Sequence, residues 1–209
     1  MESPRVQRDL AEMESYVYFD AHIKKLPKRA NGGIDTSAVG FVDNDVDAFR
    51  HAYVSGRFLH LYSERFALLL GWLNEIWFPS SPSGKNMDLW NNSVGRELAK
   101  KHRTKEGLAE AIREALDFGR LITRPGDNRE YTGSSTIKPT EDFSVVVIKK
   151  AKNGTNDIYY DVYKETFLTK QEFITAIQAG KYPAYSVRTI NQRMYPVANR
   201  NKLKSDNLG

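Results

Sequence analysis

The feature of this sequence that most constrains its fold is a change in hydrophobic period near residue 126. Before that point, apolar residues recur at the three- and four-residue spacing of amphipathic helices. After it, short runs of β-branched and aromatic residues alternate with turn formers, which is typical of strands. The pattern predicts an α+β protein with an all-α helical domain over residues 1–125, a linker over 126–143 and a small α+β module over 144–209.

The N-terminal part is predicted to hold four helices. Their expected ranges are residues 5–26, 45–77 and 88–101, and the last helix follows the N-cap Thr104. The apolar positions of the first helix are Leu10, Met13, Val17 and Ala21. The segment PSSPSGK, residues 79–85, is expected to separate the second and third helices because its prolines and glycine oppose a helical backbone.

The C-terminal part is predicted to form a β-hairpin, a helix and further short strands. The runs SVVVIKK and DIYYDVY flank KNGTN, whose Asn-Gly pair is typical of a hairpin turn. Thr169 and Glu172 have the spacing of a capping box, which predicts a short helix that ends at Gly180. AYSVRTI and RMYPV are the further strands that the pattern predicts.

Composition excludes several kinds of site. The chain contains no cysteine, so a thiolate zinc site or a cysteine nucleophile is excluded, and a metal would need His, Asp, Glu or Asn ligands. The most apolar run, Phe66–Phe78, is shorter than the roughly 20 residues that span a bilayer and contains Asn74 and Glu75, so no transmembrane segment is expected. The N-terminal residues lack the apolar centre of a cleavable signal peptide.

A polar stripe is predicted on one side of the second helix, within residues 43–58. Its members stand at i, i+3, i+4 and i+8; they are Asp47, Arg50, His51 and Ser55. A polar stripe beside an apolar face is what the wall of a site requires. The alternative is structural: the acidic residues cap the helix, Arg50 pairs with one of them, and His51 is a hydrogen-bonded core residue.

Residues 86–99 carry a second polar stripe, on the third predicted helix. Its members are Asp88, Asn91, Asn92 and Arg96, with Gly95 beside them. Two adjacent amides are poor helix formers, which suggests that they hold a polar group. The alternative is that Asn91 and Asn92 tie neighbouring helix ends together, while Gly95 permits a close approach of two helices.

Glu75 lies between the two stripes, inside the most apolar run. An ionised carboxylate is costly in such surroundings. Glu75 is therefore expected either to pair with Arg50 or Arg96 or to keep a raised pKa. A raised pKa is the condition of a general acid.

Together these residues define a candidate site. The residues expected to act in catalysis are Asp47, His51, Glu75 and Asp88. The residues expected to bind substrate are Arg50, Asn91, Asn92 and Arg96. The first set is suited to acid–base chemistry or, with an asparagine amide, to holding one divalent metal. No zinc-protease, nucleophile-elbow, Walker or dinucleotide motif chooses between the two.

Both stripes belong to motifs with a resemblance. D-A-F-R-H-A, Asp47–Ala52, followed about 35 residues later by M-D-L-W-N-N-S-V-G-R, Met87–Arg96, resembles an uncharacterised bacterial domain family. The signature of that family is D-A-x-R-H-A … H-E … M-D-x-x-N-N-x-x-G-R, and the likeness covers roughly residues 40–105. The chain departs from it at Asn74-Glu75, where the family has His-Glu, which argues against a metal site that needs two histidines.

The C-terminal part has a resemblance of its own. From Val145 to the closing S-D-N-L it is similar to a small bacterial hairpin-helix-strand module of unassigned function. The residues that carry this likeness are L-T-K-Q-E-F-I-T-A-I-Q-A-G, Leu168–Gly180, and the final D-N-L.

Members of the first family often form the C-terminal tips of secreted or polymorphic-toxin proteins of bacteria. The resemblance therefore implies an exported effector or toxin, cytoplasmic before export or secreted without a cleavable signal peptide. It also implies an immunity protein and a secretion-machine carrier as partners, and a polymeric substrate, glycan or nucleic acid.

Three functions are compatible with these observations. The first is a hydrolase that acts on the cell envelope, above all on peptidoglycan, with Glu75 as general acid and Asp88 or His51 as base or ligand. The second is a metal-dependent nuclease, because the positive excess of charge lies mainly in the C-terminal part, among tyrosines. The third is a non-catalytic binding or structural module, in which the polar residues form an internal hydrogen-bond network. The sequence leaves open whether the chain is an enzyme.

Overall fold

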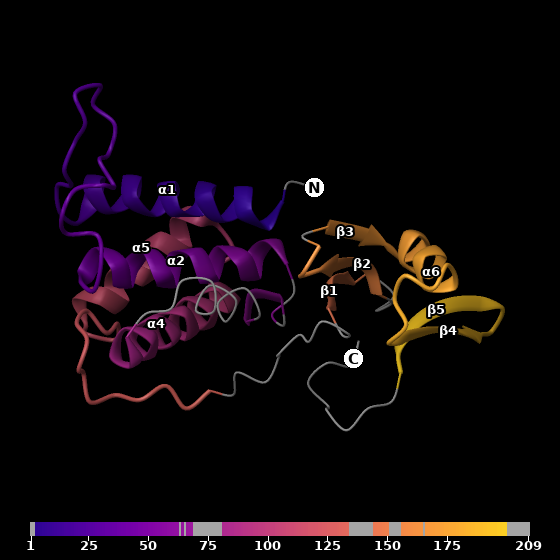
Figure 1. Ribbon diagram of the computed structural model, residues 1–209. Helices are drawn as coiled ribbons and strands as arrows, with labels where there is room; N and C mark the ends of the chain where they lie inside the picture. The colour runs from indigo at the N-terminus through magenta and orange to yellow at the C-terminus, as the bar shows by residue number, and fades with distance from the viewer. Residues whose placement is uncertain are drawn as a thin grey trace. The chain divides into compact units, whose positions relative to one another are not determined.

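The computed structural model divides the chain into two compact units, Met1–Gly133 and Ser134–Gly209. Among the described residues, the first unit is helical and the second holds strands and one helix, so the predicted α+β class is confirmed (Figure 1). The division falls within the stretch expected to be a linker. The structure describes residues 3–62, 64, 66–68, 81–133, 144–150, 156–164 and 166–199.

Within the described residues, the helices of the first unit are α1 (Pro4–His22), α2 (Asp45–Leu61), α4 (Pro82–Lys101) and α5 (Lys105–Asp117). Each begins after a residue whose side-chain oxygen accepts a hydrogen bond from the backbone of the first turn. These caps are Ser3, Asn44, Ser81 and Thr104. Among the described residues, no helix has both the length and the apolar character needed to cross a bilayer.

α2 lies between α1 and α4 and runs in the same direction as α4 (Figure 1). The direction follows from the contacts: Gly95 of α4 lies against Ala52, and further along Ala99 lies against His60. The two backbones touch, because a Cβ atom added to Gly95 would lie 1.8 Å from the carbonyl oxygen of Ala52. The absence of a side chain at Gly95 therefore permits the close helix approach.

The core of the first unit lies between α1, α2, α4 and α5, yet α1 does not bury its expected apolar stripe. Leu10, Met13 and Val17 are 49, 47 and 55% exposed. The buried side of α1 instead carries Phe19, whose ring packs edge-on against Phe49 of α2 with 5.7 Å between ring centres. The helix was predicted correctly, but its apolar spacing indicates the wrong side.

The second predicted helix, residues 45–77, is too long. α2 ends at Leu61, because Tyr62 has an extended backbone and its N–H donates to the Phe58 carbonyl as a cap. Residues 69–80 lie outside the described part of the chain. The sequence offers no glycine or proline near Tyr62, so nothing local signals the end of the helix.

The third predicted helix begins six residues earlier than expected, at Pro82 instead of Asp88. Ser81 caps the helix by accepting a hydrogen bond from the Gly84 N–H, and Pro82 occupies the first helical position. Proline fits there because its missing N–H would have no partner in the first turn anyway. The segment that was expected to break helices therefore starts one.

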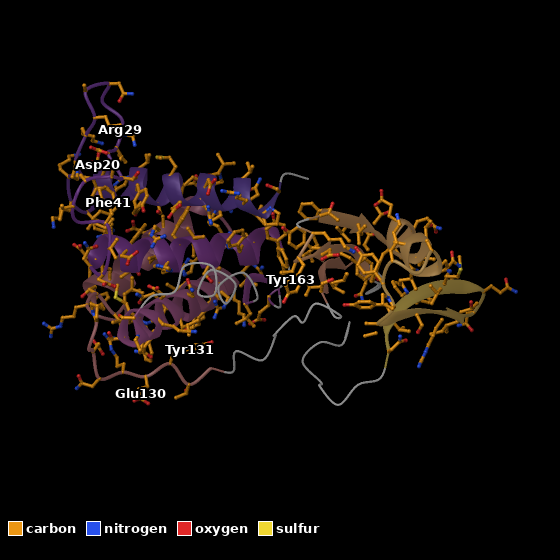
Figure 2. The ribbon with its side chains drawn as sticks, in the orientation of Figure 1. Asp20, Arg29, Phe41, Glu130, Tyr131 and Tyr163 are labelled. Carbon is orange, nitrogen blue, oxygen red and sulfur yellow. The ribbon has the colours of Figure 1, made fainter. Side chains whose placement is uncertain are left out.

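The segment that follows α5 returns along α4. The Asn86 side chain donates to the Arg129 carbonyl at 2.8 Å and accepts from the Tyr131 N–H at 2.8 Å. The Trp90 indole donates to the Arg120 carbonyl at 2.9 Å. Figure 2 shows Tyr131 on this returning segment. Residues expected to be part of a linker are thus held on the first unit by side chains of α4.

The second unit contains an antiparallel sheet of β1 (Val145–Lys150), β2 (Asn156–Asp161) and β3 (Thr166–Thr169), in that order. It continues with α6 (Lys170–Gln178) and the hairpin of β4 (Tyr185–Ile190) and β5 (Arg193–Ala198). The predicted first hairpin, the capping box and the two later strands are confirmed. β3 was not predicted, because it ends directly at the helix cap Thr169.

The core of the second unit surrounds Phe173 of α6, which is fully buried among aromatic rings of the sheet and of the segment after the helix. A buried carboxylate, Asp161, lies at the end of β2. It accepts hydrogen bonds from the Tyr182 hydroxyl at 2.8 Å and from the Tyr163 and Lys164 N–H groups at 3.1 Å. Asp161 therefore joins the sheet to the segment after α6.

Candidate functional site

The polar side chains of α2 and α4 meet along the line where the two helices touch. α2 contributes Asp47, His51 and Ser55 at i, i+4 and i+8, and α4 contributes Asp88, Asn92 and Arg96 at the same spacing. All six are buried. We call these six residues the polar seam. Because the helices are parallel, His51 of α2 lies beside Asp88 of α4 at one end of the polar seam, and Ser55 lies beside Arg96 at the other.

His51 is the centre of one end of the polar seam. Its Nε2 atom lies 3.1 Å from Oδ1 of Asp88 and 3.5 Å from Oδ1 of Asp47. One ligand atom from each of the three residues lies within 4.8 Å of the other two. Two ligands of one metal ion, each about 2.1 Å from it, lie about 3 to 3.4 Å apart at tetrahedral or octahedral angles. The two distances from His51 to the carboxylates are close to this spacing.

Asp47 is held in place by the turn that precedes α2. The N–H of Asp43 donates to Oδ2 of Asp47 at 2.8 Å, and Asp43 has a positive φ of 55°. The cap Asn44 accepts from the Asp47 N–H at 3.1 Å. The helix cap is thus an asparagine, and the carboxylate of Asp47 is left to point along the polar seam.

Arg50 joins this end of the polar seam to α1. Its guanidinium is hydrogen-bonded to Oδ1 of Asp47, and Nη1 donates to Oε1 of Glu12 at 2.7 Å. Nη2 also lies 2.8 Å from Nε2 of His51. A guanidinium nitrogen always donates, so Nε2 of His51 is an acceptor here. The predicted ion pair between Arg50 and a nearby acid exists, and it lies within the candidate site.

His51 is neutral in these surroundings. Burial lowers its pKa, and the positive charge of Arg50 lowers it further. The charge of Asp47 and a hydrogen bond with the Asn92 side chain oppose this effect only in part. An acceptor nitrogen of His51 and a carboxylate oxygen of Asp88 therefore face each other at 3.1 Å. Such a pair of acceptors is stabilised by a positive charge beside it, which Arg50 now supplies.

The other end of the polar seam is built around Arg96. Its Nη1 donates to the Ser55 hydroxyl at 2.9 Å, and its guanidinium is also hydrogen-bonded to the Tyr131 side chain. Burial lowers the pKa of Arg96. This end carries positive charge, whereas the His51 end carries two carboxylates.

The two adjacent amides have different roles. Asn91 is fully buried, donates to the Ile122 carbonyl at 2.8 Å and accepts from the Ile122 N–H at 2.9 Å. Both ends of its amide therefore tie the segment after α5 to α4, and Asn91 lies outside the polar seam. Asn92 faces His51.

Glu75, the expected general acid, and its neighbour Asn74 lie outside the described residues. Two residues that contact the site were missed: Glu12, which pairs with Arg50, and Tyr131, which contacts Arg96. Neither gives a local signal, because each reaches the site through packing between segments far apart in the sequence.

Comparison with known proteins finds a similarity over the part of the chain that carries the polar seam. A family described as "Domain of unknown function (DUF6973)" matches residues 30–119, which include α2, α4 and α5. The six residues of the polar seam all lie within that range. Neither the curated proteins nor the solved structures contain a match to the chain. The chain is thus similar to a family over its site-bearing helices, and the chemistry must be argued from the site.

Proposed function

We propose that the chain is a hydrolase whose centre is a divalent metal held by Asp47, His51 and Asp88. The observation that carries the proposal is the convergence of one imidazole nitrogen and two carboxylate oxygens within 4.8 Å of one another, at a buried helix contact. A site with one histidine and two aspartates suits Zn²⁺ or Mn²⁺. It does not need the second histidine that the chain lacks at residue 74.

Three features favour a metal over acid–base chemistry alone. The distances of 3.1 and 3.5 Å from His51 to the two carboxylates fit ligands of one ion. A neutral imidazole can bind a metal, whereas a histidine that resists protonation is a poor general acid. Finally, Arg50 occupies the place of a cation and has a second carboxylate, Glu12, to which it can turn when a metal enters.

The chemistry follows from the number of ligands. Three protein ligands leave coordination positions for water and for a substrate oxygen. A divalent ion held by these residues would supply an activated water and a Lewis acid for the bond to be cleaved. Asn92, beside His51, is placed to orient a polar group of the substrate. These are the requirements for hydrolysis of an ester, amide or glycosidic bond.

For the substrate we propose the bacterial cell envelope, with peptidoglycan first. The support is the resemblance of the two helix motifs to domains at the tips of secreted bacterial proteins. Nucleic acid is the competing substrate and is an outcome of the same test. A chain of this kind would act outside the cell that makes it.

Metal binding is the first test. The purified chain, freed of metal with EDTA, is titrated with Zn²⁺ and with Mn²⁺ by calorimetry. We expect one site, and we expect Asp88→Asn to weaken it by about a hundredfold, because loss of a carboxylate removes both a ligand and a charge. Asp117→Asn, an exposed aspartate of α5, is the matched control. Equal affinity in the two variants would refute the metal centre.

Substrate class is the second test. Metal-loaded chain is incubated with purified peptidoglycan, DNA and RNA, and the chain is also expressed in bacteria with and without an export signal. Solubilised peptidoglycan and lysis only on export support the proposal, provided that Asp88→Asn abolishes both. Cleavage of DNA or RNA, with growth arrest in the absence of export, would replace the envelope by nucleic acid. No hydrolysis of any of the three substrates contradicts the proposal.

A further inference from the structure

Arg96 differs from the two arginines of α2 that pair with carboxylates of α1. Arg50 has a carboxylate oxygen of Glu12 at 2.7 Å, and Arg57 has one of Glu14 at 3.2 Å. Within the described part of the chain, Arg96 forms no ion pair with a carboxylate. Its partners there are hydroxyl groups, Ser55 at 2.9 Å and Tyr131. Arg96 is only 7% exposed.

A buried guanidinium whose partners are neutral has no negative charge beside it to offset the cost of burying its own charge. Burial lowers the pKa of Arg96, whereas the carboxylates around Arg50 raise its pKa. Among the described carboxylates, Glu64 raises the pKa of Arg96 through its charge. Glu64 is exposed, however, and forms an ion pair with Lys100 at 2.6 Å. A guanidinium has five N–H donors in a planar fork, and Ser55 and Tyr131 account for only part of them. Among the described residues, no anion completes this set of donors.

Arg96 also stands at a defined distance from the proposed metal centre. It lies eight residues after Asp88 on α4, and Ser55 lies four residues after His51 on α2. At about 1.5 Å per residue, eight residues correspond to about 12 Å along the helix. Asn92 lies between the two ends. A substrate that runs alongside α4 would reach both.

We infer that Arg96, Ser55 and Tyr131 form an oxyanion subsite, and that the substrate carries a carboxylate or phosphate roughly 12 Å from the bond that is cleaved. A guanidinium binds the two oxygens of either group with parallel hydrogen bonds, and the two hydroxyl groups can rotate to donate to the same anion. The place of this subsite in a substrate rests on the proposed function. The binding of an anion does not.

The test uses the full chain, treated with EDTA so that no metal contributes. Arginine Nε–Hε signals are followed by NMR while inorganic phosphate or acetate is added at constant ionic strength. We expect the Arg96 signal to shift saturably with at least one of the two anions. The Arg57 signal, from an arginine already paired with Glu14, is the internal control and should not shift. Saturation by phosphate alone or by acetate alone identifies the group. A signal of Arg96 that moves with neither, or only as much as that of Arg57, overturns the inference.

Variants separate the subsite from a purely structural arginine. Arg96→Lys keeps the charge but loses the planar fork, and Tyr131→Phe and Ser55→Ala each remove one hydroxyl group. For the two hydroxyl variants, followed at the Arg96 signal, anion binding should be about tenfold weaker. For Arg96→Lys, calorimetry with the same anion should show the same loss. If Glu75→Gln binds the anion and the native chain does not, Arg96 has an internal partner and the inference fails. Zn²⁺ affinity should be unchanged in Tyr131→Phe, so failure of the metal centre and failure of the subsite are distinguishable.

Discussion

His51 is the residue whose ionisation most directly links the candidate site to stability. Its pKa in the folded chain is lowered from 6.5 by burial and by Arg50. As the pH falls below 6.5, His51 binds a proton in the unfolded chain but stays neutral in the folded chain. The free energy of unfolding must therefore decrease on acidification, beginning just below the unfolded pKa and continuing towards the folded one.

This gives a prediction for His51→Gln. In metal-free protein, the native chain should lose more unfolding free energy between pH 7.5 and pH 5 than the variant does, because glutamine cannot bind a proton. Urea denaturation at the two pH values measures the difference, and the other titrating groups are common to both chains. Equal losses would show that His51 is protonated in the folded state.

A second prediction concerns Arg50. Arg50→Gln removes the cation that Asp47 and Glu12 share, and leaving the buried carboxylate of Asp47 without it should lower the stability of the metal-free chain by about 3 kcal/mol. The same change removes the competitor for the proposed metal, so Zn²⁺ should bind more tightly and restore part of the stability. Thermal unfolding with and without Zn²⁺ tests both. Weaker Zn²⁺ binding would mean that Arg50 supports the site instead of occupying it.

The site was predictable from sequence as far as helix geometry determines it. The i, i+4, i+8 spacing places Asp47, His51 and Ser55 on one side of α2, whatever the rest of the fold. The difference between Asn91 and Asn92 was not predictable, because successive residues on a helix point about 100° apart and the rotation of α4 decides which one faces His51. That rotation is fixed by packing.

At the scale of elements, the contact between α2 and α4 holds the polar seam together. Gly95→Ala would place a Cβ 1.8 Å from the Ala52 carbonyl oxygen, so the helices must separate. We expect a loss of about 3 kcal/mol of stability. Zn²⁺ should also bind more weakly, because His51 is on α2 and Asp88 is on α4, and separating the helices moves the two ligands apart. The control is Gly107→Ala in α5, whose new Cβ would have side-chain atoms of Thr104 and His102, not backbone, as its nearest neighbours. Similar losses in the two variants would contradict this account of the helix contact.

α1 provides a prediction about which of two faces is the core face. Phe19→Ala should cost about 3 to 5 kcal/mol, because the ring is fully buried against α2. Val17→Ser should change stability by no more than about 0.5 kcal/mol, because Val17 is 55% exposed. Urea denaturation of the two variants decides, and the reverse order would mean that the other face of α1 is buried.

Elements were predictable where capping residues are local and unambiguous. Thr104 and the Thr169–Glu172 pair fix two helix starts from a few residues of sequence. The end of α2 at Tyr62 was not predictable, because an extended backbone there is imposed without any helix-breaking residue. The face of α1 was not predictable either, because that helix carries apolar residues on two sides and only tertiary packing chooses between them.

At the scale of the whole molecule, the polar seam and its supporting contacts all belong to the first unit, which has a hydrophobic core of its own. Residues 1–133 alone should therefore fold and bind Zn²⁺ with the affinity of the full chain. Circular dichroism and calorimetry on the truncated chain measure both. A folded first unit that has lost its Zn²⁺ affinity would show that the second unit contributes to the metal centre.

The change in hydrophobic period allowed the two-part organisation to be expected from sequence, since it marks where helices give way to strands. The position of the boundary needed long-range contacts. Asn86 and Trp90 of α4 form hydrogen bonds with the backbone of residues 120–131. No sequence pattern in that segment predicts these contacts.

The most direct measurement is the anomalous diffraction of a crystal soaked with Zn²⁺. The account predicts one peak about 2.1 Å from Nε2 of His51 and from one oxygen each of Asp47 and Asp88, with the Arg50 guanidinium turned to Glu12. A crystal in which Arg50 keeps its contacts with Asp47 and His51, and in which no Zn²⁺ lies between the three residues, would contradict it.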